Sequence, residues 1–161
     1  MHSKSSLLSS YGAHSLNFSE KDKNLLIKQL QNQILTNGKI CEKFETKICN
    51  VVKSKYAVVC NNGTSALMMS ILATEIKNLV VIIPNINFVA ASNLVLLLKG
   101  KVILCDVNEN TGMCDNDAFN KIIDFCKKKR LKPNLFIPVH FAGDVMDLEE
   151  IEKICKKEKI I

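Results

Sequence analysis

Short apolar runs alternate with longer helical segments from residue 56 to the end of the chain. The apolar runs are rich in β-branched residues and cover 56–60, 79–83, 101–105 and 134–138. The segments near 64–76, 87–98, 115–129 and 147–157 are typical of helices in pattern and length. Strands that are apolar on both faces and alternate with helices predict an α/β domain, in which helices cover both sides of a parallel sheet.

The residues before position 56 predict an arm followed by two helices. Residues 1–18 are Ser-rich and irregular, which is typical of an extended arm. Ser19 and Asp22 have the spacing of a helix start, and apolar residues follow them at helical intervals as far as Ile34. Gly38 ends that pattern, and we expect a second helix over 41–52, with Phe44, Ile48 and Val51 on one face.

Residues 157–161 read as the start of a further strand after the last helix. A sheet that stops within a strand predicts a truncated domain. The alternative is a short edge strand that completes the sheet.

Composition and charge exclude several classes of protein. The chain has 161 residues, of which 47% are apolar and 24% charged, and this favours one soluble domain. The formal charge of +6 comes mostly from lysines on predicted helices. The densest basic run, 127–130, ends a helix without interleaved aromatic residues, so we expect a solvated helix end and no nucleic-acid partner.

The seven cysteines indicate a reducing compartment. Their number is odd and no C-x-x-C pair occurs, which argues against a disulfide framework and against a zinc site. We expect no metal site. The N-terminal sequence lacks the features of a signal peptide, and no apolar run reaches the length of a membrane span. The prediction is therefore a cytoplasmic protein without a membrane partner.

The junction after the first apolar run has the features of an anion site. Asn61–Gly63 form a polar turn, and a helix is expected to open at Thr64, followed by Ser65. A glycine lets a ligand approach the backbone, while the first helical turn offers unpaired N–H groups and two hydroxyl groups. The alternative is that these residues only make a good turn and helix cap. The pattern matches neither a P-loop nor a dinucleotide fingerprint.

Polar residues follow the other predicted strands as well. Asn85–Phe88, Asp106 and His140–Gly143 stand at the carboxyl ends of their strands. Ligands bind parallel sheets at these ends, so we expect the turns to converge on one site. Taken singly, each residue has a structural alternative: Phe88 as a core helix residue, His140 as a satisfied structural side chain, and Asp106 as a cap or turn residue.

Four ordered motifs carry a resemblance to a known family. They are NNGTSAL at 61–67, PNINFVAA at 84–91, VILCDV at 102–107 and PVHFAG at 138–143, and MDLEEI at 146–151 continues the match. Upstream, Tyr11-Gly12, LTNGK at 35–39 and Phe44-Glu45 fit the same pattern. The chain resembles the DegT/DnrJ/EryC1/StrS family of pyridoxal-phosphate-dependent aminotransferases, which act on nucleotide-linked keto sugars. Within that family it looks most like 4-aminotransferases of the pseudaminic-acid type.

The resemblance implies a fold, a cofactor and site residues. Residues 19–161 would form the N-terminal part of the three-layer, parallel-sheet large domain of a fold-type I transferase, which works as a homodimer. Gly63, Thr64 and Ser65 would hold the phosphate of pyridoxal 5′-phosphate, and Phe88 would stack on its ring. Tyr11 and His140 would face the substrate. The complete enzyme would transfer an amino group, with glutamate as the expected donor, to a nucleotide-linked keto-deoxysugar for surface-glycan synthesis.

The resemblance also implies what residues 1–161 lack. The lysine that binds the cofactor aldehyde and the aspartate that pairs with the pyridine nitrogen have no counterpart here, so no catalytic residue is expected. We expect a truncated chain that is inactive alone. The alternatives are a family member that acts at another sugar carbon, a non-catalytic binding or scaffold fragment that pairs with another subunit, and a complete small α/β domain that matches the motifs by chance.

Overall fold

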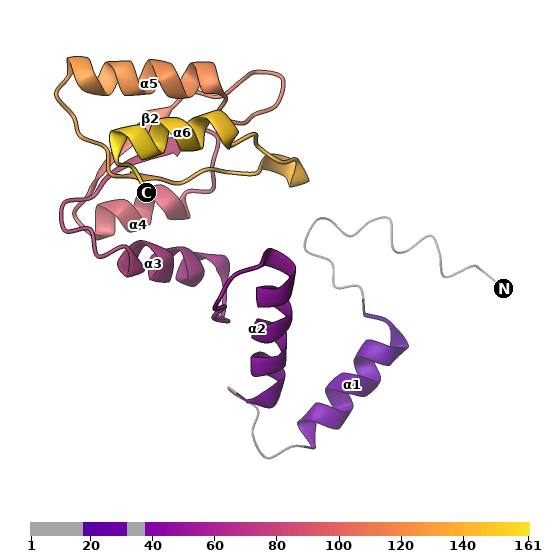
Figure 1. Cartoon of the computed structure of the whole chain (residues 1–161). Helices are drawn as coiled ribbons and strands as arrows, with labels where there is room; N and C mark the ends of the chain where they lie inside the picture. The colour runs from indigo at the N-terminus through magenta and orange to yellow at the C-terminus, as the bar shows by residue number, and fades with distance from the viewer. Residues whose placement is uncertain (1–17, 32–37) are drawn as a thin grey trace. The chain divides into compact units, whose positions relative to one another are not determined.

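The computed structural model describes residues 18–31 and 38–161, which divide into two compact units, 1–59 and 60–161. In the first unit, α1 spans Glu20–Leu30 and α2 spans Lys39–Val52 (Figure 1). The predicted start of α1 is confirmed, because the Ser19 side chain accepts from the Asp22 amide and the Asp22 carboxylate accepts from the Ser19 amide. The second helix begins two residues earlier than predicted, directly after Gly38.

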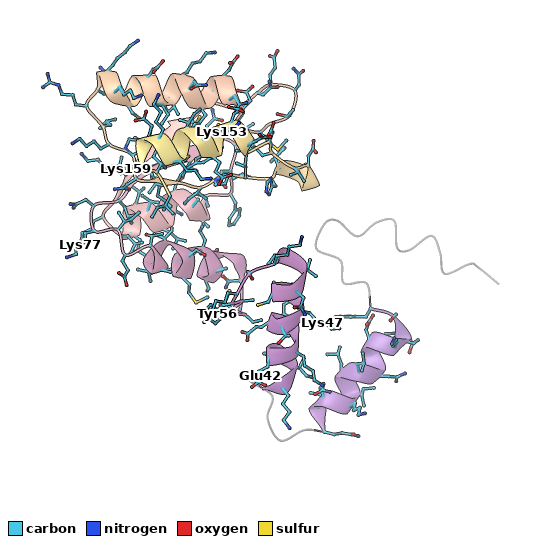
Figure 2. All side chains as sticks on the ribbon, viewed as in Figure 1. Glu42, Lys47, Tyr56, Lys77, Lys153 and Lys159 are labelled. Carbon is cyan, nitrogen blue, oxygen red and sulfur yellow. The ribbon has the colours of Figure 1, made fainter. Side chains whose placement is uncertain are left out.

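The predicted strand at 56–60 is wrong for the part of the chain that the structure describes. Tyr56, which Figure 2 labels in the segment between α2 and α3, is 75% exposed, and Val58 is 72% exposed. The Val59 amide donates to Glu45 Oε1 at 2.9 Å instead of to a neighbouring strand. The apolar pattern at 56–60 indicates only a propensity for strand. A strand also needs a neighbouring strand to pair with, and the described residues supply none for this segment.

The second unit contains a three-stranded parallel sheet in the order β2-β1-β3. The strands are β1 Val80–Pro84, β2 Lys101–Cys105 and β3 Leu135–Phe136. In the register, Val80 stands opposite Lys101, and Val81 stands opposite Leu135. Three of the four predicted strands and their parallel arrangement are confirmed, although β1 begins one residue later than expected and β3 is shorter.

Helices cover both faces of this sheet, as the sequence predicts. On one face, α3 (Gly63–Ala73) and α4 (Ala90–Leu97) pack with Val81 and Ile83 into one core cluster. On the other face, α5 (Asn116–Lys128) and α6 (Glu149–Glu158) pack with Ile82 into a second cluster. Alternate residues of β1 therefore point to opposite helix layers, and Figure 1 shows this α/β/α arrangement.

Residues 157–161, which were predicted to begin a further strand, form no strand in the described structure, although Ile161 hydrogen-bonds beside β3. Helix α6 continues to Glu158, and Lys159 adopts a left-handed conformation that ends it. Ile161 then pairs with β3, because its amide donates to the Asn134 carbonyl at 3.1 Å and its carbonyl accepts from the Phe136 amide at 2.8 Å. The predicted arm, 1–18, lies outside the described residues except for Phe18, so the domain bounds stay predictions.

In the described ranges, 18–31 and 38–161, no helix is both long and apolar enough to span a membrane.

Candidate functional site

Strand connectivity opens a crevice between β1 and β3. The chain leaves β1 through α4 toward β2, whereas it leaves β3 through α6 toward Ile161, on the opposite side. Neighbouring strands whose outgoing connections diverge form a crevice at their carboxyl ends, which is where ligands bind in α/β sheets. A cavity of about 450 Å³ occupies this position. Its lining residues come from α3, from the loop after β1 with the start of α4, and from the segment after β3: Gly63, Thr64, Leu67, Asn87, Phe88, Ala90, Ala91, Ile137, Pro138, Val139 and His140.

The first turn of α3 supplies amide donors to this cavity. Asn62 caps the helix, and its Oδ1 accepts from the Ser65 amide at 2.8 Å. Within the described residues, the amides of Gly63 and Thr64 have no hydrogen-bond partner, as expected for the first amides of a helix. A Cβ placed on Gly63 would meet no atom within 4 Å, so the space in front of this backbone is open.

The predicted phosphate-binding trio is therefore divided. Gly63 and Thr64 line the cavity, whereas Ser65 does not and its amide is used by the helix cap. The cap interpretation of the junction is confirmed, and the two unpaired amides leave room for an anion site, which stays a prediction. The first turn of α3 contains no acidic residue, so no side chain of the helix start competes with an anion for the helix dipole.

Phe88 lies at the cavity with its side chain uncovered. It precedes α4 and is 76% exposed, so the alternative that it is a core helix residue is wrong. Phe88 also lines a neighbouring, more apolar cavity of about 390 Å³ between α3 and α4. An exposed aromatic ring at a cavity offers a flat face to a ligand ring.

His140 has a structural hydrogen bond and also lines the cavity. Its Nδ1 accepts from the Met146 amide at 3.0 Å, which fixes the orientation of the ring. Because Nδ1 is an acceptor, a neutral imidazole carries its proton on Nε2 and can donate only from that atom. The structural and site interpretations of His140 are thus compatible.

Asp106 has the turn role that was its alternative. Its Oδ1 accepts from the Val107 amide at 3.0 Å and from Asn85 Nδ2 at 3.3 Å. Asp106 is not among the lining residues of the cavity, although its strand ends at the same edge of the sheet. Tyr11 lies outside the described residues.

Asn87 belongs to the predicted turn 85–88, but the sequence did not single it out as a site residue. It lines the cavity, and its Nδ2 is buried without a hydrogen-bond partner. A buried donor without an acceptor costs about 1–3 kcal/mol, so this donor would gain from an acceptor placed in the cavity. The other unpartnered buried side-chain atom in the described residues, Asn116 Oδ1, lies at the start of α5 and does not line the cavity. The sequence feature that could have identified Asn87 is its position next to Phe88, in the motif that follows a predicted strand.

The comparison with protein families identifies the chain. The sequence model of the DegT/DnrJ/EryC1/StrS aminotransferase family matches residues 17–161. The chain belongs to this family. The predicted resemblance is confirmed, and with it the fold class of an α/β domain related to pyridoxal-phosphate-dependent aminotransferases.

Individual relatives are considerably longer than this chain. It is 31% identical over 144 residues to a UDP-4-amino-4,6-dideoxy-N-acetyl-beta-L-altrosamine transaminase from Campylobacter jejuni, with 89% of this chain and 37% of the relative covered. The Helicobacter pylori protein of the same name is 31% identical over 146 residues, with 88% and 36% covered. The chain thus spans a little over a third of the length of these curated relatives.

Solved structures agree with this assignment. Helicobacter pylori PseC, described as an aminotransferase involved in the biosynthesis of pseudoaminic acid, is 28% identical with a TM-score of 0.76, and the match covers 89% of this chain and 38% of PseC. The pyridoxal-phosphate form of the putative sugar aminotransferase Spr1654 from Streptococcus pneumoniae has a TM-score of 0.77 at 20% identity, covering 88% and 35%, which shows the shared fold.

Pyridoxal phosphate is the cofactor of the family, and the cavity fits such a group. Unpaired amides at a helix start suit a phosphate, the exposed ring of Phe88 suits a pyridine, and Asn87 has a donor to spare. The lining residues include no lysine and no carboxylate.

Proposed function

We propose that this chain forms the phosphate-binding and ring-binding side of the pyridoxal-phosphate site of a sugar aminotransferase. The observation that carries the proposal is that Gly63, Thr64, Phe88 and His140, singled out from separate motifs, line one cavity at the crevice between β1 and β3. The amides of Gly63 and Thr64 and the Thr64 hydroxyl bind the phosphate, and the Ser65 hydroxyl approaches it from the next position. Phe88 orients the ring.

The bound cofactor supplies a ring that accepts negative charge from the carbon that gains or loses the amino group. The residues of this chain bind and orient it. Asn87 donates from Nδ2 to an acceptor in the cavity, and His140 donates from Nε2 toward the substrate. No lining residue has an amine to bind the aldehyde or a carboxylate to pair with the pyridine nitrogen. We therefore expect residues 1–161 to bind the cofactor without covalent attachment and to be inactive alone.

The substrate of the complete enzyme is proposed from the relatives. Two of them are named as transaminases of a UDP-linked 4-amino-4,6-dideoxy sugar, which favours amino transfer to a nucleotide-linked keto-deoxysugar. From the resemblance to the family we further propose that this reaction serves surface-glycan synthesis in the cytoplasm. A second candidate is a relative with another sugar substrate, because a 3-oxo-glucose-6-phosphate:glutamate aminotransferase from Bacillus subtilis is 29% identical. That relative's name also supports glutamate as the amino donor.

The outer faces of α3 and α4 support a homodimer. Neither helix contains a charged residue, yet Leu72, Leu96 and Leu97 are each more than half exposed. Helices without charge are normally buried on all sides. A second copy of the chain would cover this face, and sedimentation velocity tests this by whether the mass is that of one chain or two.

Calorimetric titration with pyridoxamine 5′-phosphate tests the proposed site. This probe has an amine in place of the aldehyde, so binding does not depend on a lysine. We expect it to bind at least tenfold more tightly than pyridoxamine, because a hydrogen bond to a charged group contributes about 1.5–3 kcal/mol. Equal affinities for the two compounds would contradict a phosphate site. Thr64→Val, which removes only the hydroxyl donor, should lower the affinity for the phosphorylated probe and leave pyridoxamine binding unchanged.

Borohydride reduction tests the expected lack of covalent attachment. The full chain is mixed with pyridoxal phosphate, reduced, digested and analysed by mass spectrometry. We expect only scattered, substoichiometric labelling of exposed lysines. Stoichiometric labelling of one lysine would contradict the expectation.

A further inference from the structure

Two buried thiols face each other where β2 ends and α5 begins. The sulfur atoms of Cys105 and Cys114 are 3.3 Å apart, and the two residues are 0% and 2% exposed. Cys105 is the last residue of β2, and Cys114 directly precedes Asp115, the N-cap of α5. A disulfide has an S–S distance of about 2.05 Å, so the sulfurs need to approach each other by only a little more than 1 Å.

Among the described residues, the other cysteines have no second thiol in hydrogen-bonding contact, although Cys114 is near enough to Cys155 for its charge to help raise the pKa of Cys155. Residues 18–31 and 38–161 include all seven cysteines, and in these ranges no second pair of sulfur atoms is in hydrogen-bonding contact. Cys126 and Cys155 are also buried, which raises the pKa of each thiol, in the case of Cys155 to about 11. Burial of a thiol alone gives an inert cysteine, whereas contact with a second thiol gives a partner for oxidation.

We propose that Cys105 and Cys114 form an intramolecular disulfide when the folded chain meets hydrogen peroxide, which makes this pair an oxidative modification site outside the cofactor cavity. The hydrogen bond between the two sulfurs supports Cys114 as the first nucleophile. Either sulfur can donate in this hydrogen bond, which lowers the pKa of Cys114 and raises that of Cys105. The carboxylate of Asp115 opposes the charge on Cys114.

The chemistry is balanced by one peroxide molecule. The Cys114 sulfur attacks a peroxide oxygen, the O–O bond breaks, and the released oxygen leaves as water while Cys114 becomes a sulfenic acid. The Cys105 sulfur then attacks the sulfenic sulfur, the S–O bond breaks, and the hydroxyl leaves as a second water with the remaining thiol proton. The two thiols lose two electrons and two protons in total, and the peroxide is reduced to water.

The disulfide would close a loop that contacts the segment bearing His140. Gly112, in the loop between the two cysteines, has φ +67°, and a Cβ there would lie only 2.9 Å from Cδ1 of Phe141. Phe141 follows His140, a lining residue of the cofactor cavity. At the other end of the loop, the Cys105 carbonyl accepts from the Asn85 amide at 2.8 Å. Oxidation therefore fixes a loop that packs beside the candidate site.

Peptide mapping of the full chain tests the proposal. The folded protein is exposed to hydrogen peroxide, denatured, alkylated with N-ethylmaleimide and digested with trypsin without reduction. Both cysteines fall in the single tryptic peptide 102–121, because lysines stand at positions 101 and 121 and none lies between them. After oxidation we expect this peptide to carry no alkyl group, because neither thiol is free to react. Its mass should be that of the unalkylated dithiol peptide minus two hydrogen atoms.

Variants give the assay its controls. Cys114→Ser should remove the non-alkylated product, and so should Cys105→Ala, each checked for folding by circular dichroism. Cys126→Ser, another buried thiol, and Cys155→Ser should leave the product unchanged. The proposal is overturned if peptide 102–121 keeps both alkyl groups while other cysteines are oxidised. It is equally overturned if Cys155→Ser removes the product.

Discussion

Replacement of Phe88 by alanine separates the role of this ring in binding from any role in the fold. The side chain is 76% exposed and is absent from both core clusters, so its removal leaves no cavity in the core. We expect Phe88→Ala to change the free energy of unfolding by no more than about 0.5 kcal/mol. Stacking of aromatic rings contributes about 0.5–1.5 kcal/mol beyond area burial. The affinity for pyridoxamine 5′-phosphate should therefore fall by a factor of about two to ten.

Phe125→Ala is the matched control. Phe125 is 45% exposed and belongs to α5, in the helix layer on the other side of the sheet from α3 and α4. Both variants are titrated with the same probe by calorimetry, and their unfolding is followed by circular dichroism in urea. The reasoning is refuted if Phe88→Ala binds as tightly as the unchanged chain, or if Phe125→Ala weakens binding to the same extent.

Four further substitutions test the fold and the helix caps. A Cβ at Gly100 would lie 2.7 Å from a neighbouring side-chain carbon, so Gly100→Ala should lower the free energy of unfolding by about 1–3 kcal/mol in urea titrations. Gly63→Ala meets open space, so it should keep that stability but weaken binding of the phosphorylated probe. Phe119 is fully buried with its ring centroid 4.7 Å from that of Phe136, and Phe119→Ala should cost about 3–5 kcal/mol; a loss below 1 kcal/mol would contradict this packing. Hydrogen bonds, chiefly from the Ala118 amide of α5, lower the pKa of Asp115 below 3.8. The ionised Asp115 side chain therefore stabilises the fold above its unfolded-state pKa, and this stabilisation is lost as pH falls through the lower folded-state pKa. Asp115→Asn keeps a capping side chain, and its melting temperature should depend less on pH in that acidic range; identical profiles would exclude the titration of Asp115 as a cause.

The fold was predicted where local pattern and tertiary context agree. Residues 101–105 form β2 with the bounds that the apolar run gave, because each of them pairs in register with a residue of β1 and Ile103 and Cys105 are buried in the core. The same kind of run at 56–60 forms no strand, since an apolar pattern does not say whether a neighbouring strand is present to pair with it.

The site was predicted less completely, because contacts between side chains determine which of its groups are free to bind a ligand. The motifs placed Gly63 and Phe88 after predicted strands, but only Phe88 follows a strand, β1. Gly63 opens α3 and still lines the same cavity as Phe88. The sequence could not show that Asn62 uses the Ser65 amide, or that Nδ2 of Asn87 is left without a partner. These depend on side-chain orientations that the spacing of residues does not determine.

Amide chemical shifts measured by NMR during titration with pyridoxamine 5′-phosphate show directly whether the start of α3 holds the phosphate of the cofactor. We expect the largest shifts at the amides of Gly63 and Thr64, with smaller shifts at Phe88. Shifts concentrated instead around the basic cavity of about 550 Å³ that Lys127, Arg130 and Lys132 help to line would contradict this expectation.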